Sequence, residues 1–221
     1  MRDHGSAASR KSELLVATTN QGKLAELKAL LPQLKILAPS DLETQLAIEE
    51  TGRTFVENAR LKASAYHLAT GLRTMGEDSG IEIDALNGEP GVYSARYHGL
   101  SDGPIKNAYV LELLRDVPDP RRGCRYVCAI VLIDQNGREH VFEGRCRGRI
   151  ARAPAGEGGF GYDPIFLVPR LGRTMAELSA EEKNRISHRG RAVRKLARYL
   201  TAENARIRRR GVRSQEEAPR A

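Results

Sequence analysis

Two pairs of adjacent carboxylates are the side chains in this sequence best suited to hold a metal ion. Glu77 and Asp78 lie between glycines in a predicted turn where one β run ends and another begins, and Glu49 and Glu50 lie in a loop upstream. Adjacent carboxylates in such a turn are unfavourable unless a cation or solvent satisfies them. Carboxylate oxygens are the ligands that Mg²⁺ shares with substrate phosphates and waters. Each pair alone is more simply surface charge, but together they could hold a metal from two loops.

A polar turn at residues 18–23 follows an apolar run and precedes a segment of helical periodicity. The free backbone N–H groups of a helix N-terminus, together with the charge of Lys23, suit a phosphate. The turn is not a Walker A loop, because Ala17 and Leu24 stand where that motif needs a glycine and a Ser or Thr. An ordinary capped turn is the alternative interpretation.

Two further segments are too polar and too rich in glycine to form a core. Residues 154–164 place four glycines around Phe160 and Tyr162, so that a purine could stack on either ring. Residues 183–189 gather cations at the start of the last predicted helix, with Ser187 as its candidate N-cap. These cations repel one another unless an anion or a carbonyl group lies among them.

Apolar periodicity predicts the elements that must position these segments. Strands are predicted at residues 13–18, 36–37 and 80–86, and helices at about residues 23–31, 54–70, 104–115 and 187–200. Thr54 and Glu57 form a capping box and Gly71 is a stop signal. Two β runs joined by Gln135-Asn136-Gly137 predict a hairpin. This order of elements indicates an α/β chain.

Composition limits the class of protein. The chain is 40% hydrophobic and 29% charged, which fits a globular protein. No apolar run approaches the roughly 18–20 residues that span a bilayer, and the first residues do not form a secretory signal. The three cysteines do not form a disulfide pattern. We therefore expect a cytoplasmic protein that does not enter a membrane.

The net charge of +8 raises the question of nucleic-acid binding. Five of the eight units lie in residues 1–12 and 201–221, which are polar and lack apolar periodicity. No repeat or long linker divides the remaining chain. We therefore predict one domain at residues 13–200 between two disordered ends, and we do not expect a nucleic-acid partner.

Five segments, in this order, resemble the Ham1-like inosine triphosphate pyrophosphatase family. They are ATTNQGKLAEL, EETGRTFVENARLKA, EDSGIEIDALNGEPGVYSARYHG, AGEGGFGYDPIFLVP and AELSAEEKNRISHRGRA, and they extend from about residue 14 to 200. The resemblance implies an elongated mixed β-sheet with flanking helices and two lobes around a nucleotide-binding cleft. It also implies a homodimer that uses Mg²⁺ to hydrolyse dITP, ITP and XTP to the nucleoside monophosphate and pyrophosphate.

The resemblance also implies roles for individual residues. Asp78 falls on the proton acceptor, and Glu49 and Asp78 fall on the metal ligands. The substrate-binding positions fall on Thr18, Thr19, Asn20, Gln21, Gly22, Lys23, Lys62, Ser79, Phe160, Gly161, Tyr162, Asp163, Lys183, His188 and Arg189. The chain has Glu77 where the family usually has aspartate, which leaves the geometry and number of metal ions open.

His188 and Arg189 could donate hydrogen bonds to the 6-oxo group of hypoxanthine or xanthine and would lack a partner opposite adenine. How guanine is excluded, and which of ITP, dITP and XTP is preferred, does not follow from the residues. The Maf-like nucleotide pyrophosphatases, which prefer other bases, are the nearest alternative enzyme class. A protein that binds nucleic acid through its basic ends is the alternative from another class.

Overall fold

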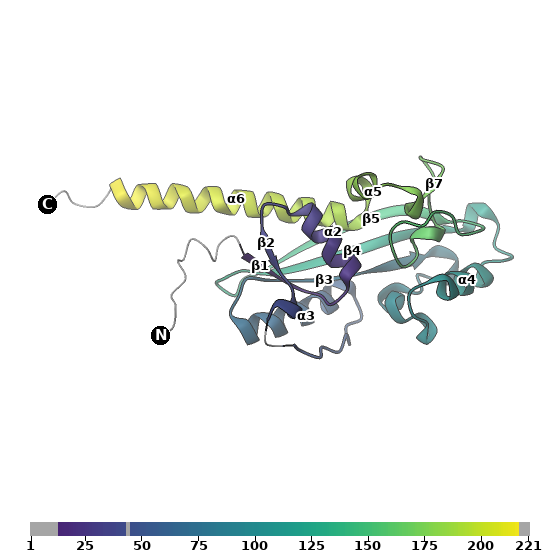
Figure 1. The fold of residues 1–221 in the computed structure, drawn as a ribbon, viewed down its shortest axis with the longest axis horizontal. Coiled ribbons are helices and arrows are strands. Elements are labelled where there is room, and N and C mark those ends of the chain that lie inside the picture. The colour runs from purple at the N-terminus through teal and green to yellow at the C-terminus, as the bar shows by residue number, and fades with distance from the viewer. Residues whose placement is uncertain (1–12, 43–44, 217–221) are drawn as a thin grey trace.

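A mixed β-sheet of seven strands forms the middle of the molecule (Figure 1). The computed structural model describes residues 13–42 and 45–216. The strands are β1 (Glu13–Ala17), β2 (Lys35–Leu37), β3 (Thr74–Ile83), β4 (Gly123–Ile133), β5 (Glu139–Ile150), β6 (Phe166–Val168) and β7 (Arg173–Thr174), in the spatial order β2-β1-β3-β4-β5-β6-β7. β1 runs parallel to β2 and β3, and the other neighbours are antiparallel. The predicted α/β class, the mixed sheet and the hairpin of β4 and β5 are confirmed.

Helices cover both faces of this sheet. They are α2 (Gln21–Leu30), α3 (Phe55–Thr70), α4 (Pro104–Leu113), α5 (Ala180–Ile186) and α6 (His188–Glu216). Figure 1 shows α2 and α6 along one face and α3 on the opposite face. β4 is buried on both sides, so its alternate residues join different clusters: Ile130 packs with α2 and α6, and Val131 packs with α3. A strand buried on both faces reads as a continuous apolar run.

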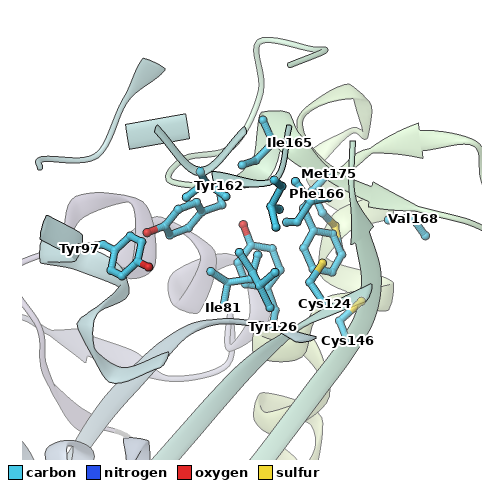
Figure 2. Packing of buried hydrophobic residues seen from close by; sticks show 14 of the residues in the cluster. Ile81, Tyr97, Cys124, Tyr126, Cys146, Tyr162, Ile165, Phe166, Val168 and Met175 are labelled. Carbon is cyan, nitrogen blue, oxygen red and sulfur yellow. The ribbon is translucent and has the colours of Figure 1, made fainter. Parts of the chain in front are cut away.

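A second apolar cluster lies towards α4 and β7 (Figure 2). The ring of Tyr126 on β4 stacks on Phe166, with 4.3 Å between centroids. The polar tips of two tyrosines point out of this cluster: the Tyr126 hydroxyl donates to Asp163 at 3.2 Å and the Tyr162 hydroxyl donates to the Ser94 carbonyl at 2.9 Å. This cluster therefore holds the glycine-rich loop that carries residues 160–163.

Local signals set the ends of α3 as predicted. Thr54 accepts a hydrogen bond from the Glu57 backbone N–H at 3.1 Å, and the Glu57 carboxylate accepts from the Thr54 N–H at 3.2 Å. Gly71 ends the helix with a φ of 65°, a conformation that glycine adopts without a steric penalty. The predicted helix at residues 54–70 is confirmed.

The predicted turn at Glu77 and Asp78 is wrong. β3 begins at Thr74 and passes through both carboxylates, with Asp78 opposite Ala129 of β4. Pairing with β4 satisfies the backbone along the whole strand, and cations on each face of the sheet compensate the buried carboxylates. The predicted strand at residues 80–86 is the second half of this longer strand.

The last helix also differs from the prediction. Lys183 lies in the separate helix α5, and Ser187 accepts a hydrogen bond from the Gly190 N–H at 3.0 Å, as an N-cap of α6 does. α6 continues to Glu216, so residues 201–216 are helical where disorder was predicted. Alanine, glutamate and arginine favour helix without apolar packing, and Glu203 forms an ion pair with Arg73. Residues 1–12 and 217–221, also predicted to be disordered, lie outside the described residues.

Among the described residues, no helix is both long enough and apolar enough to cross a membrane.

Candidate active site

A cavity of about 380 Å³ brings together most of the residues that the sequence analysis selected. Of those residues, the cavity is lined by Thr18, Thr19, Asn20, Lys23, Lys62, Asp78, Ser79, Phe160, Gly161, Tyr162, Asp163, Lys183, His188 and Arg189. They come from the β1–α2 turn, α3, β3, the glycine-rich loop, α5 and α6. Gln21, Gly22 and Glu49 do not line it.

The β1–α2 turn presents the N-terminus of α2 to the cavity. Asn20 is its N-cap, and its side chain accepts a hydrogen bond from the Lys23 N–H at 2.9 Å. No acidic residue lies in the first turn of this helix, so the partial positive charge of the helix end is available to an anion. Gly22 allows the Phe160 ring to approach α2, because a Cβ at this position would lie 2.8 Å from that ring. Gln21 is exposed.

Asp78 lies on the face of β3 that meets α3. Its Oδ2 accepts a hydrogen bond from Asn58 Nδ2 at 3.1 Å, and its Oδ1 lies 3.5 Å from Lys62 Nζ. Burial raises the pKa of this carboxyl group above its ordinary 3.8, although the charges of Lys62 and Lys23 oppose the shift. Asp78 thus combines a proton-accepting group with an adjacent cation.

Asn58 was not among the predicted site residues, although its polar side chain on the core-facing side of α3 indicates a buried partner. Its side chain accepts a hydrogen bond from the Gly52 N–H at 2.8 Å and donates to Asp78, so it connects the upstream loop to the carboxylate. Asn58 and Lys62 are polar residues one helical turn apart beside the buried Ala59 and Ala63. Polar side chains on the core-facing side of a helix need buried partners.

The structure brings Glu50, and not Glu49, to the cavity. Side chains at Leu46, Ile48 and Glu50 line the cavity, and the residues between them are exposed. This alternation is typical of an extended segment, in which successive side chains point to opposite sides. Glu50 lies 2.6 Å from Lys62 Nζ and 3.2 Å from the Arg96 guanidinium. The role of Glu49 as a metal ligand stays a prediction.

A network of buried ion pairs runs beside the cavity on the other face of β3. Arg189 pairs with Glu77 at 3.1 Å and with Glu26 of α2, and Lys183 pairs with Glu26 and with Asp163 at 2.6 Å each. The Asp163 carboxylate also accepts the Phe160 N–H at 2.8 Å. Glu26 was not among the predicted site residues, because its position between the apolar residues of α2 is typical of an exposed helical residue.

Phe160, not Tyr162, offers the ring for stacking. The Tyr162 side chain is buried in the cluster of Figure 2, and its hydroxyl is bound to the Ser94 carbonyl. Phe160 is half-buried, and Lys183 Nζ and Arg189 Cζ lie 4.7 and 5.5 Å from its ring centroid. This end of the cavity therefore combines an aromatic face with two cations.

His188 is buried beside these cations. Its ring stacks on Tyr126 with 4.5 Å between centroids, and no protein group hydrogen-bonds its Nδ1. Burial and the neighbouring Arg189 hold its pKa well below the ordinary 6.5. A neutral imidazole can donate from one nitrogen and accept at the other.

This pKa shift predicts a pH-dependent stability. Unfolded His188 takes up a proton below about pH 6.5, whereas folded His188 does not, so stability falls as the pH decreases below that value. We expect wild type to lose up to about 1.4 kcal/mol per pH unit more than His188→Gln between pH 6.5 and 5.5. Urea unfolding of both proteins at several pH values measures this difference, and parallel curves would contradict the prediction.

The sequence of this chain is similar to the sequences of known proteins. The family model described as Ham1 family matches residues 14–199. A dITP/XTP pyrophosphatase from Gloeobacter violaceus is 53% identical over 83% of this chain and 91% of its own length, and one from Staphylococcus epidermidis is 46% identical over 86% and 97%.

Solved structures show the same similarity. The Ham1 protein of Staphylococcus aureus superimposes with a TM-score of 0.76 at 41% identity, covering 86% of this chain and 99% of that one. A HAM1 protein from Coxiella burnetii has a TM-score of 0.77 at 43% identity, covering 86% and 98%.

Proposed function

The chain belongs to the Ham1 family, and we propose on this premise that it hydrolyses dITP, ITP and XTP to the nucleoside monophosphate and pyrophosphate. The observation that carries this proposal is that one cavity is lined by two chemically distinct sets of side chains, which we call its phosphate end and its base end. Asp78, Lys62 and the α2 N-terminus suit phosphates, and Phe160 with His188 suits a base. Such an enzyme removes non-standard purines from the nucleotide pool.

The residues at the phosphate end account for the hydrolysis. Asn58 holds one carboxylate oxygen of Asp78, which leaves the other facing Lys62 and positioned to accept the proton of an attacking water. Lys62, beside Asp78, stabilises the negative charge that develops on the phosphates, and Lys23 binds the phosphate charge already present in the substrate. The helix N-terminus at Asn20 binds phosphate oxygens through backbone N–H groups.

The donors at this end fit Mg²⁺, the cofactor that the family resemblance implies. Asp78 and Glu50 both line the cavity, and we propose them as the protein's oxygen ligands. Among the described residues, no group of three or more His, Cys, Asp or Glu is arranged to hold a metal. Phosphate oxygens and waters would therefore complete the coordination, as is usual for Mg²⁺. When bound, the ion would neutralise triphosphate charge.

The base end explains a preference for 6-oxo purines. His188 and Arg189 carry buried nitrogens, Nδ1 and Nε, that no protein group hydrogen-bonds. A 6-oxo group accepts hydrogen bonds, whereas the 6-amino group of adenine presents donors and would leave the Nε–H of Arg189, which can only donate, unpaired. An unpaired buried donor is unfavourable by about 1–3 kcal/mol.

The homodimer implied by the family resemblance and the cytoplasmic location expected from the composition also belong to this proposal. Ile105 on α4 and Tyr93 are 75% and 59% exposed, which is consistent with an apolar contact to a second copy.

Release of pyrophosphate from a panel of triphosphates tests the proposed function. ITP, dITP, XTP and the four standard ribonucleotides are each assayed with Mg²⁺ and with EDTA. We expect turnover of the first three only, and its loss in EDTA. Equal turnover of all bases would contradict the proposal, and preference for another base would favour the Maf-like alternative. Salt-sensitive binding of nucleic acid without turnover would favour a nucleic-acid-binding protein.

A further inference from the structure

Glu77 stands where the related family usually has aspartate, and its carboxylate points away from Asp78. In β3 the two residues are neighbours, so their side chains lie on opposite faces of the sheet. The strand register agrees with this. Asp78 lies opposite Ala129, which packs with Phe55 of α3. Glu77 lies opposite Ile130, which packs with α2 and α6. Glu77 is fully buried and does not line the cavity. It is therefore separated from the proposed metal ligands by the strand itself.

The Glu77 carboxylate connects two cations that do line the cavity. One oxygen lies 2.9 Å from Lys23 Nζ, and the other lies 3.1 Å from an Arg189 nitrogen. The second oxygen also accepts a hydrogen bond from the Cys128 thiol at 3.3 Å. Lys23 belongs to the phosphate end of the cavity and Arg189 to the base end. Glu77 thus contacts, from behind the cavity, one cation at each end of the proposed nucleotide site.

Burial does not prevent this carboxylate from being charged. Lys23 Nζ at 2.9 Å and an Arg189 nitrogen at 3.1 Å compensate its buried negative charge. Without the carboxylate, Lys23 and Arg189 would repel each other with little screening by water, since Arg189 is buried and only 15% of the Lys23 side chain is exposed. An aspartate would be shorter by one carbon–carbon bond, about 1.5 Å, and could not keep both contacts at hydrogen-bond distance.

We infer that Glu77 is a positioning residue that sets the distance between the phosphate-binding Lys23 and the base-binding Arg189 and takes no part in metal binding. This inference deepens the proposed function and rests on it. Its consequence is that Glu77 affects how tightly the whole nucleotide is bound, whereas Asp78, on the other face of the strand, performs the chemical step without it. An interaction that is equally strong in the ground state and the transition state changes KM more than kcat.

Steady-state hydrolysis of ITP by Glu77→Asp and Glu77→Gln tests this role. We expect KM to rise about tenfold or more in both variants, as for loss of hydrogen bonds between charged groups, with kcat within about threefold of wild type. The Mg²⁺ concentration for half-maximal activity should not change, because Glu77 faces away from Asp78. The matched control is Glu82→Asp, the same substitution on the same strand in an ion pair with Arg125 outside the cavity, which should behave as wild type.

Each outcome bears on a separate statement. If wild type does not release pyrophosphate from ITP, the proposed function fails. The role of Glu77 is then tested by calorimetric measurement of pyrophosphate binding in the absence of metal. The Glu77 variants should bind pyrophosphate more weakly than wild type, because Lys23 is displaced in them. If wild type is active and the variants keep its KM, or shift the Mg²⁺ midpoint together with kcat, the inference is overturned. A lower unfolding temperature with unchanged KM would show a structural role only and would also overturn it. If Glu77→Asp does not fold, the KM of Glu77→Gln, which preserves the length and volume of the side chain, decides between these outcomes.

Discussion

Replacement of Asp78 by asparagine should lower kcat for ITP by about a thousandfold, within the range found for loss of a general base. Asparagine has the same shape and can accept the hydrogen bond that Asn58 donates at 3.1 Å, but its amide cannot take a proton from water at neutral pH. Measurement of kcat and KM for pyrophosphate release at saturating Mg²⁺ gives the result directly.

The stability of this variant distinguishes loss of chemistry from loss of fold. The pKa of Asp78 is raised in the folded state, chiefly by burial, so folding disfavours its ionised form and a neutral replacement should not destabilise the protein. We expect an unfolding free energy equal to or above that of wild type. Asp84→Asn, at an exposed residue beyond the end of β3, is the control and should retain full activity. A kcat for Asp78→Asn near the wild-type value would remove Asp78 from the mechanism.

Replacement of Gly76 by alanine should lower the free energy of unfolding by about 3 kcal/mol, the upper part of the usual range for overpacking. A Cβ at Gly76 would lie 2.0 Å from the Ala59 carbonyl oxygen and 2.8 Å from the Ala63 nitrogen, both in the backbone of α3. The helix cannot relieve this contact by a side-chain rotation, so it must move away from the sheet. Urea unfolding followed by circular dichroism measures the loss.

The same displacement should reduce activity, because α3 carries Asn58 and Lys62 to Asp78. Gly123→Ala is the matched control: a Cβ there would lie 2.4 Å from a carboxylate oxygen of Asp84, the end of an exposed side chain that can rotate. We expect this control to remain close to wild type in both stability and turnover. Equal stability of Gly76→Ala and Gly123→Ala would show that α3 does not depend on the close approach at Gly76.

Much of the local structure could be predicted because its causes lie within a few residues. The capping box of Thr54 and Glu57 and the stop at Gly71 each depend on hydrogen bonds between near neighbours. The same holds for the hairpin of β4 and β5, whose turn contains Gly137 with a φ of 75°. The order of motifs along the chain was sufficient to indicate the Ham1 family, which the comparisons then confirmed.

Errors arose where a residue's environment depends on distant segments. The glycines around Glu77 and Asp78 indicated a turn, but they lie in a continuous strand, where Gly76 allows α3 to approach and Gly80 allows the approach of Ser94. The end of the last helix was placed too early because apolar spacing stops near Leu200, whereas the helix continues to Glu216.

The sequence by itself therefore determined which chemical groups this protein has and in which local elements they occur: a polar turn before a helix, paired carboxylates, an aromatic loop and cations near the last helix. Only the tertiary structure decided which of them meet. It turned Glu50 and not Glu49 to the cavity, placed Asp78 and Glu77 on opposite faces of one strand, and brought Glu26 to Lys183 and Arg189. The physical reason is that propensity and capping act over one helical turn, whereas the partner of a buried charge is selected by the packing of elements far apart in the chain.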